Sequence, residues 1–149
     1  YGLPAAVGFA LSKKLKGEDG KVYVLMSDGE LQCGTTWESA LIAAHHKLDN
    51  LVVIVDANQF QAMGQVADIL PIHNLLTTFG HVGFSSDFCD GHNFEELNRK
   101  IQMPNKLPMF IYAHTTKGKG VSFMENNNLY HYKNLSEEEY NLALEELSL

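Results

Sequence analysis

The feature that most constrains the fold is an unbroken apolar run, Leu51 to Val55. A strand with one wet face alternates apolar and polar residues, whereas a continuous apolar run is typical of a parallel strand covered on both faces. A second apolar run, Val22 to Met26, precedes it, and a helix pattern over about Thr35 to Leu48 separates the two. This order predicts the α/β class, with a parallel sheet and helices on both faces.

The same alternation continues along the rest of the chain. A helix is expected from Pro4 to about Lys16, buried on most sides because its apolar residues lie almost all round. After an irregular loop over 56–67, we expect a short helix over Ile72 to Phe79, ended by Gly80, and a weaker strand over His81 to Phe88. The last expected elements are a helix from Asn93 to about Gln102, a strand over Met109 to Ala113, a long loop, and a helix opened by a capping box at Ser136.

Length, charge and cysteine content bound the possible functions. A chain of 149 residues, 45% of them hydrophobic, fits a single domain, 1–149, with a sizeable core. The formal net charge of -7, without a basic stripe, argues against nucleic acid as a partner. No apolar run approaches the ~20 residues of a membrane span, so no membrane association is expected. Cys33 and Cys89 lack disulfide-type spacing and are expected to be free thiols in a cytoplasmic protein.

Polar residues follow two of the expected strands at the ends where parallel sheets bind ligands. Asp28 and Gly29 come soon after the first apolar run, and Asn58 stands soon after the second. Carboxylate and carboxamide oxygens are hard ligands for Mg²⁺, and a glycine lets a phosphate oxygen approach the backbone. The pattern indicates a metal-anchored diphosphate at the carboxyl edge of the sheet.

A set of ordered motifs resembles the thiamine-diphosphate-binding half of transketolases. In chain order the motifs are Val24 to Gln32, Trp37 to Ala40, His45 to Leu51, Asp56 to Asn58, Asp90 to His92, and Thr116 to Met124. They cover almost the whole chain and are far more specific than a lone Asp-Gly pair. The resemblance implies the thiamine-diphosphate-binding fold and the transfer of a two-carbon ketol unit between sugars.

The resemblance also implies which residues form the site. Mg²⁺, for which Ca²⁺ is a possible substitute, would be bound by Asp28, Asn58 and the backbone carbonyl of Phe60. His131 would be the catalytic histidine, near the diphosphate and the first carbons of the sugar substrate. The expected cofactor-binding residues are Asp28, Gly29, Glu30, Asn58, Phe60, Lys117 and His131.

The same resemblance implies a partner. In transketolases the glutamate that protonates the aminopyrimidine ring of the cofactor comes from a different domain, which no part of this chain resembles. We therefore expect a piece of a split-type subunit, with a fold incomplete at its N-terminus, that acts in an oligomer with a C-terminal, pyrimidine-binding subunit. The helix over 35–48 is expected to present Trp37 and Ala40 to that partner. Cys33 stands where many relatives carry an interface glutamate, and its role is open.

Two other functions stay open. Thiamine-dependent 2-oxoacid dehydrogenases and deoxyxylulose-phosphate synthases share the metal motif, although the contexts of Trp37 and His92 look more like transketolase. The other alternative is a non-catalytic remnant of the fold that binds no cofactor, which the missing upstream segment and Cys33 would suit. The sequence does not identify the sugar donor and acceptor.

Overall fold

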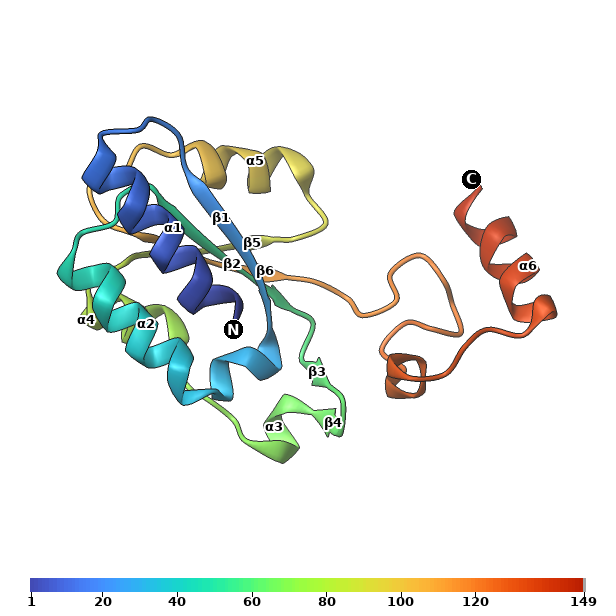
Figure 1. Ribbon diagram of the computed structural model, residues 1–149. Coiled ribbons are helices and arrows are strands. Elements are labelled where there is room, and N and C mark those ends of the chain that lie inside the picture. The colour runs from blue at the N-terminus through green and yellow to red at the C-terminus, as the bar shows by residue number, and fades with distance from the viewer. Residues whose placement is uncertain (149) are drawn as a thin grey trace.

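The computed structural model describes residues 1–148, which form an α/β domain followed by a C-terminal arm (Figure 1). The main sheet has four strands in the order β1-β2-β6-β5, and every neighbouring pair is parallel. Their bounds are Val22–Ser27 for β1, Leu51–Ala57 for β2, Met109–His114 for β6 and Ser85–Asp90 for β5. The predicted parallel sheet is confirmed.

The remaining elements connect these strands or follow them. The α-helices are α1 (Gly2–Lys16), α2 (Gly34–His45), α3 (Val66–Ile69), α4 (Leu75–Val82), α5 (Phe94–Gln102) and α6 (Glu137–Leu147). Two short 3-10 helices are η1 (Asp28–Gln32) and η2 (Asn128–His131), and a small hairpin pairs β3 (Phe60–Gln61) with β4 (Gly64–Gln65).

Helices cover both faces of the sheet, as expected (Figure 1). On one face, α1, α2 and α4 bury the side chains of Val53, Val55 and Phe110, and the ring of Phe79 stacks on Phe110 with centroids 3.8 Å apart. On the other face, α5 packs against residues of β2 and β6. The run Leu51 to Val55 is therefore covered on both sides, which explains why it carries no polar residue.

Several element boundaries differ from the prediction. The helix expected from Ile72 begins at Leu75, the helix expected to reach Leu48 ends at His45, and the loop expected over 56–67 contains β3, β4 and the start of α3. Helix α4 ends at Val82 and is capped by Gly83 rather than ended by Gly80, because Gly83 adopts the left-handed conformation (φ 117°) and donates its N–H to the Phe79 carbonyl. A side chain at Gly83 would also begin 3.1 Å from the Cβ of Ala44 on α2. His81 and Val82 consequently belong to the helix, and the strand expected from His81 begins only at Ser85.

The buried sides of the first two helices were also predicted incorrectly in part. Phe9 on α1 is 68% exposed, so α1 is buried along one face rather than on most sides. On α2 the small residue Ala40 is fully buried, and Trp37 packs on Phe79 and donates its Nε1–H to the Leu31 carbonyl (2.9 Å). The expectation that Ala40 faces a partner subunit is therefore wrong, whereas Trp37 is half-buried and its contact with a partner stays a prediction. The exposed apolar residues of α2 are Leu41 and Ile42.

After β6 the chain leaves the sheet and forms the arm, residues 115–148, which extends away from the strands (Figure 1). The predicted capping box at its last helix is present, because Ser136 Oγ accepts from the Glu139 N–H and Glu139 Oε2 accepts from the Ser136 N–H. Ser122 donates to Glu146 from both its N–H and its hydroxyl. In the described part of the chain no helix has the length and apolar character needed to cross a bilayer.

Candidate functional site

The carboxyl ends of three strands lie side by side. Ser27, Asp56 and Ala113 occupy one row across β1, β2 and β6. The segments that follow these residues carry Asp28, Asn58 and the start of the arm, so the two polar residues singled out in the sequence meet at one edge. That prediction of their neighbourhood is confirmed.

Asp28 is a buried carboxylate without a basic partner. Only 3% of the residue is exposed, and its Oδ2 accepts the backbone N–H of Gln59 at 2.7 Å. Burial raises the pKa of Asp28 from 3.8 to about 6, and the nearby Asp56 carboxylate adds to the rise. The backbone N–H groups of Gln59 and Asn58 and the nearby His114 oppose the rise in this pKa. No lysine, arginine or histidine within residues 1–148 forms an ion pair with Asp28. A bound cation would supply the missing countercharge.

A sharp bend after β2 brings the second group of oxygen atoms to Asp28. Gln59 has a left-handed backbone (φ 68°), which is uncommon outside glycine, and this bend aims its N–H at the Asp28 carboxylate. On either side of the bend, Asn58 Oδ1 accepts the N–H of Phe60 at 2.9 Å, and Asn58 Nδ2 donates to Asp56 Oδ2 at 3.2 Å. The Gln59 side chain donates to the hydroxyl of Tyr112 at 2.7 Å.

These residues fit a hard divalent cation. The donors would be the Asp28 carboxylate, the Asn58 amide oxygen and the Phe60 carbonyl, all oxygens of the kind that Mg²⁺ and Ca²⁺ prefer. The described residues contain no group of three or more His, Cys, Asp or Glu side chains that could hold a metal ion. A cation here would therefore rely on amide and carbonyl oxygens, and the ligand roles of the three residues stay predictions.

Gly29 and Glu30 lie in the 3-10 turn that follows β1. A Cβ on Gly29 would meet the Gln61 side-chain oxygen at 3.2 Å, so the small residue lets the turn pack closely against the β3–β4 hairpin. The Glu30 carboxylate accepts the Ser27 N–H at 3.0 Å and so stabilises the start of this turn. Any contact of Gly29 or Glu30 with a cofactor stays a prediction.

Lys117 lies beside the predicted metal ligands. A cavity of about 310 Å³ is lined by Asp56, Asn58, His92, Thr115, Thr116, Lys117 and Gly118. A second cavity, of about 160 Å³, is lined in part by Asp28, Gln59 and Tyr112. The ammonium group of Lys117 gives the first cavity a positive charge close to the acidic edge of the sheet. This combination suits an anion that also binds a cation.

His131 ends η2, which packs against β3. The contact includes a hydrogen bond from Asn128 Nδ2 to the Ala62 carbonyl (3.3 Å), so the helix that carries His131 lies at the hairpin that carries Phe60. The His131 side chain itself is exposed. The structure thus brings the elements of His131 and Phe60 together, while the catalytic role of His131 stays a prediction.

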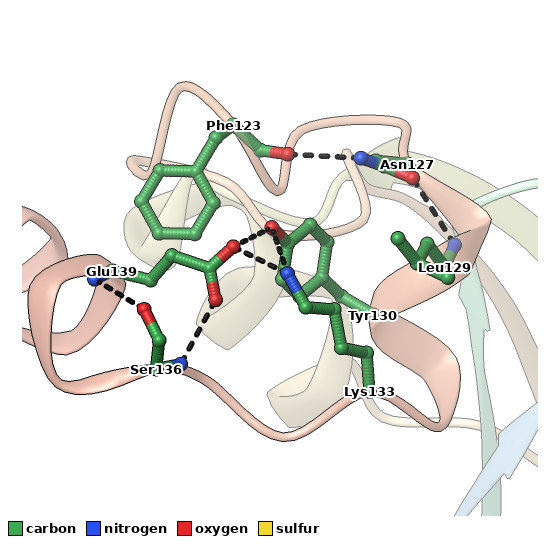
Figure 2. A network of polar contacts seen from close by, with 7 residues as sticks. All are labelled: Phe123, Asn127, Leu129, Tyr130, Lys133, Ser136 and Glu139. Carbon is green, nitrogen blue, oxygen red and sulfur yellow. Dashed lines mark hydrogen bonds and ion pairs between the residues drawn. The ribbon is translucent and has the colours of Figure 1, made fainter.

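A polar network holds η2 against the start of α6 (Figure 2). The Tyr130 hydroxyl donates to Glu139 Oε1 at 2.8 Å, and Lys133 pairs with the same carboxylate and lies over the Tyr130 ring, 5.0 Å from its centroid. These bonds lower the pKa of Glu139 to about 2, chiefly through Lys133. Because Tyr130 directly precedes His131, the network restrains the backbone that carries the histidine.

Three functional candidates were missed in the sequence. Asp56 and Tyr112 face the site from β2 and β6, and Thr115 donates its hydroxyl to Asp56 Oδ1. Asp56 is the first residue of the Asp56 to Asn58 motif, and Thr115 directly precedes the Thr116 to Met124 motif. Their pairing across 59 positions depends on the register of β2 with β6, which no local pattern reveals.

The bend at Gln59 gives a prediction for this site. Gln59→Val is expected to destabilise the chain by about 1–2 kcal/mol and to weaken metal binding, because a β-branched residue fits the left-handed region poorly. Gln59→Gly is the matched control, since it also loses the bond to Tyr112 but adopts this conformation freely. Urea unfolding of both variants measures the difference. Equal stability of the two would show that the backbone at Gln59 is not the source of strain.

Known proteins match the chain over nearly all of its length. Residues 5–149 match the family model described as transketolase, thiamine diphosphate binding domain. The chain is 42% identical over 149 residues to an apulose-4-phosphate transketolase subunit from Actinobacillus succinogenes and 36% identical over 151 residues to the protein of the same name from Phocaeicola vulgatus. Each match covers 99% of this chain and 54% of the relative, so the chain spans about half the length of these relatives.

A solved structure agrees with these relatives. The crystal structure of transketolase from Campylobacter jejuni superimposes with a TM-score of 0.93 at 32% sequence identity. The match covers 99% of this chain and 25% of the longer one. The fold, including the arm, therefore matches one part of the Campylobacter jejuni polypeptide.

Proposed function

The chain belongs to the family of transketolase thiamine-diphosphate-binding domains, and we propose that it binds the diphosphate of the cofactor and Mg²⁺ in a split-type transketolase. The assembled enzyme would transfer a two-carbon ketol unit from one sugar to another. The observation that carries the proposal is the buried Asp28 carboxylate, which has no basic partner and lies beside the bend that holds Asn58 and Phe60.

The residues of this chain would act mainly by binding and orientation. Asp28, Asn58 and the Phe60 carbonyl would hold the cation, which in turn neutralises the diphosphate. When bound, thiamine diphosphate supplies the stabilisation of a carbanion that ketol transfer needs. Lys117 adds positive charge on the cavity side. His131, on the restrained helix η2, would donate a hydrogen bond to the diphosphate or to the sugar at its first carbons.

A partner subunit is part of the same proposal. The two relatives from Actinobacillus and Phocaeicola are each named as one subunit of a transketolase. In this chain apolar residues are exposed on α2, Leu41 and Ile42, and on the arm, among them Leu129 and Tyr132. Apolar surface of this kind is typical of protein interfaces. We propose that a C-terminal, pyrimidine-binding subunit covers part of it. The free thiols of Cys33 and Cys89 support a cytoplasmic setting.

Calorimetric titration of thiamine diphosphate with Mg²⁺ into the chain mixed with its companion subunit tests the proposal. Asn58→Ala is expected to weaken binding about tenfold or more, because it removes one metal ligand, and the exposed Asn98→Ala on α5 is the matched control. Unchanged binding in Asn58→Ala would contradict the assigned ligand. No binding by the wild-type pair would favour a non-catalytic remnant, and turnover of pyruvate as donor would favour the 2-oxoacid or deoxyxylulose-phosphate enzymes.

A further inference from the structure

We infer that Thr115 and the turn Asp90-Gly91-His92 are positioning residues for the metal-binding amide of Asn58, and that they act through Asp56. The inference rests on the proposed function, because it takes Asn58 to be a metal ligand. It assigns a role to the Asp90-Gly91-His92 motif, whose three residues form no hydrogen bond with Asp28, Asn58 or Phe60. Each step in this series of contacts is a hydrogen bond or a close steric contact.

The first link fixes which way the Asn58 amide points. A carboxamide can rotate by half a turn and exchange its oxygen with its NH₂ group, and only the oxygen can bind a cation. The Asn58 NH₂ donates to Asp56 Oδ2 at 3.2 Å, and an ionised carboxylate accepts hydrogen bonds but donates none. Asp56 therefore selects the orientation in which Oδ1 faces away from it, toward the Phe60 N–H at 2.9 Å. The second lone pair of Oδ1 is then free for a cation.

The second link holds Asp56. The Thr115 hydroxyl donates to Asp56 Oδ1, the oxygen that Asn58 does not use. Each carboxylate oxygen thus has its own partner, and the carboxylate plane is fixed. Asp56 pairs with Ala113 in the register of β2 with β6, so Thr115 reaches it from the first residues after β6. Without the hydroxyl, Asp56 is free to rotate and its hold on the Asn58 NH₂ weakens.

The third link places Thr115. A Cβ on Gly91 would lie 2.5 Å from Thr115 Cγ2 and 3.1 Å from the His114 carbonyl oxygen, so only glycine lets the threonine methyl sit against this turn. The Gly91 N–H donates to that same carbonyl at 2.7 Å. On the other side of Thr115, the N–H of Thr116 donates to His92 Nε2 at 2.7 Å. The turn therefore forms hydrogen bonds with the residues immediately before and after Thr115.

The turn is itself ordered from within. Asp90 Oδ1 accepts the N–H of His92 at 2.9 Å, which fixes the histidine backbone, and Asp90 lies at the end of β5. The contacts thus run from the edge strand β5 through β6 to the end of β2, across the carboxyl edge of the sheet. Substitutions in such outer partners of metal ligands typically cost 10–100-fold in metal affinity.

Thr115→Val and Thr115→Ser test the inference. Valine keeps the methyl group against Gly91 but lacks the hydroxyl, whereas serine keeps the hydroxyl. The first readout is Mg²⁺ titration at saturating thiamine diphosphate, with the companion subunit present. Thr115→Val is expected to weaken Mg²⁺ binding by about 10–100-fold and Thr115→Ser by about threefold at most. Asp56→Asn, which replaces the carboxylate by a group of the same shape, is expected to match Thr115→Val.

A second readout needs neither activity nor cofactor. Hydrogen exchange of the Asn58 side-chain NH₂, followed by NMR, is expected to be slow in the wild type and in Thr115→Ser and faster in Thr115→Val. Wild-type Mg²⁺ affinity and wild-type exchange in Thr115→Val would overturn the positioning role alone. Failure of the wild-type pair to bind Mg²⁺ would instead overturn the proposed function, and the metal role of Asn58 with it.

Discussion

Asp28→Asn is expected to abolish Mg²⁺-dependent binding of thiamine diphosphate and, at the same time, to stabilise the metal-free chain above pH 6. Both effects have one cause, the burial of a carboxylate that forms no ion pair within residues 1–148. Asparagine keeps an oxygen for the Gln59 N–H but removes the charge that attracts the cation.

The direction of the pH dependence follows from the raised pKa. The carboxyl has a pKa of about 6 in the folded chain and 3.8 when unperturbed, so the unfolded chain ionises it more readily. Ionised Asp28 therefore destabilises the metal-free fold fully above pH 6, and the penalty disappears as the pH falls from 6 to below 3.8. A shift of this size corresponds to about 3 kcal/mol at most.

Urea unfolding in the presence of a chelator, at pH 5 and pH 8, measures this effect. Asp28→Asn is expected to gain more stability over the wild type at pH 8 than at pH 5, and to show no further stabilisation by Mg²⁺ with thiamine diphosphate. Asp19→Asn, at an exposed position, is the matched control for loss of one charge. If the difference in unfolding free energy between Asp28→Asn and the wild type were the same at pH 5 and pH 8, this result would contradict the burial of an ionised Asp28.

Gly118→Ala is expected to disrupt the first turn of the arm and to lower cofactor affinity with it. Gly118 has a left-handed backbone (φ 71°), and a Cβ there would lie 2.5 Å from the backbone oxygen of Met124. No side-chain rotation relieves a contact with backbone, so the turn must open. The hydrogen bonds from the Val121 N–H to Gly118 and from the Asn126 N–H to Lys117 would be strained or lost.

The expected cost is about 2–4 kcal/mol, from about 1–2 kcal/mol for a left-handed alanine and the loss of one or two hydrogen bonds. For a chain of this size it corresponds to a fall in Tm of roughly 5–15 °C. Gly8→Ala on α1 is the control, because nothing lies within 4 Å of a Cβ there and alanine favours helix. Calorimetric scans and cofactor titration measure both effects. A Gly118→Ala chain with wild-type Tm would show that the turn tolerates a side chain.

The elements that sequence predicted best are those whose signal is local. The continuous apolar run Leu51 to Val55 by itself predicts a strand covered on both faces. Asp28 and Asn58 come soon after strands, so their position at one edge of the sheet could also be inferred. The end of α4 could not, because Gly80 and Gly83 both stop helices equally well in isolation. The choice of Gly83 depends on its close approach to Ala44, which is a tertiary contact.

The hydrogen bond between Asp56 and Thr115 could not be predicted from the sequence, because it too depends on a tertiary contact. In the sequence Asp56 is one more residue at the end of a strand, and Thr115 is one of two threonines in a loop. Only the pairing of β2 with β6 brings them together. The outward face of α2 was likewise misjudged in part, since Ala40 is buried within the chain while its neighbour Leu41 is exposed.

The strand order has a consequence for how this chain emerges from the ribosome. β6 lies between β2 and β5, although it is the last of the four strands to be synthesised. Until residue 114 is available, β1 and β2 can pair, but β5 has no neighbour and the inner edge of β2 is bare. Bare strand edges recruit other chains. The inner edge of β2 is therefore exposed to misassembly while residues 58–114 are being made, and pairing of β6 with β2 and β5 covers that edge.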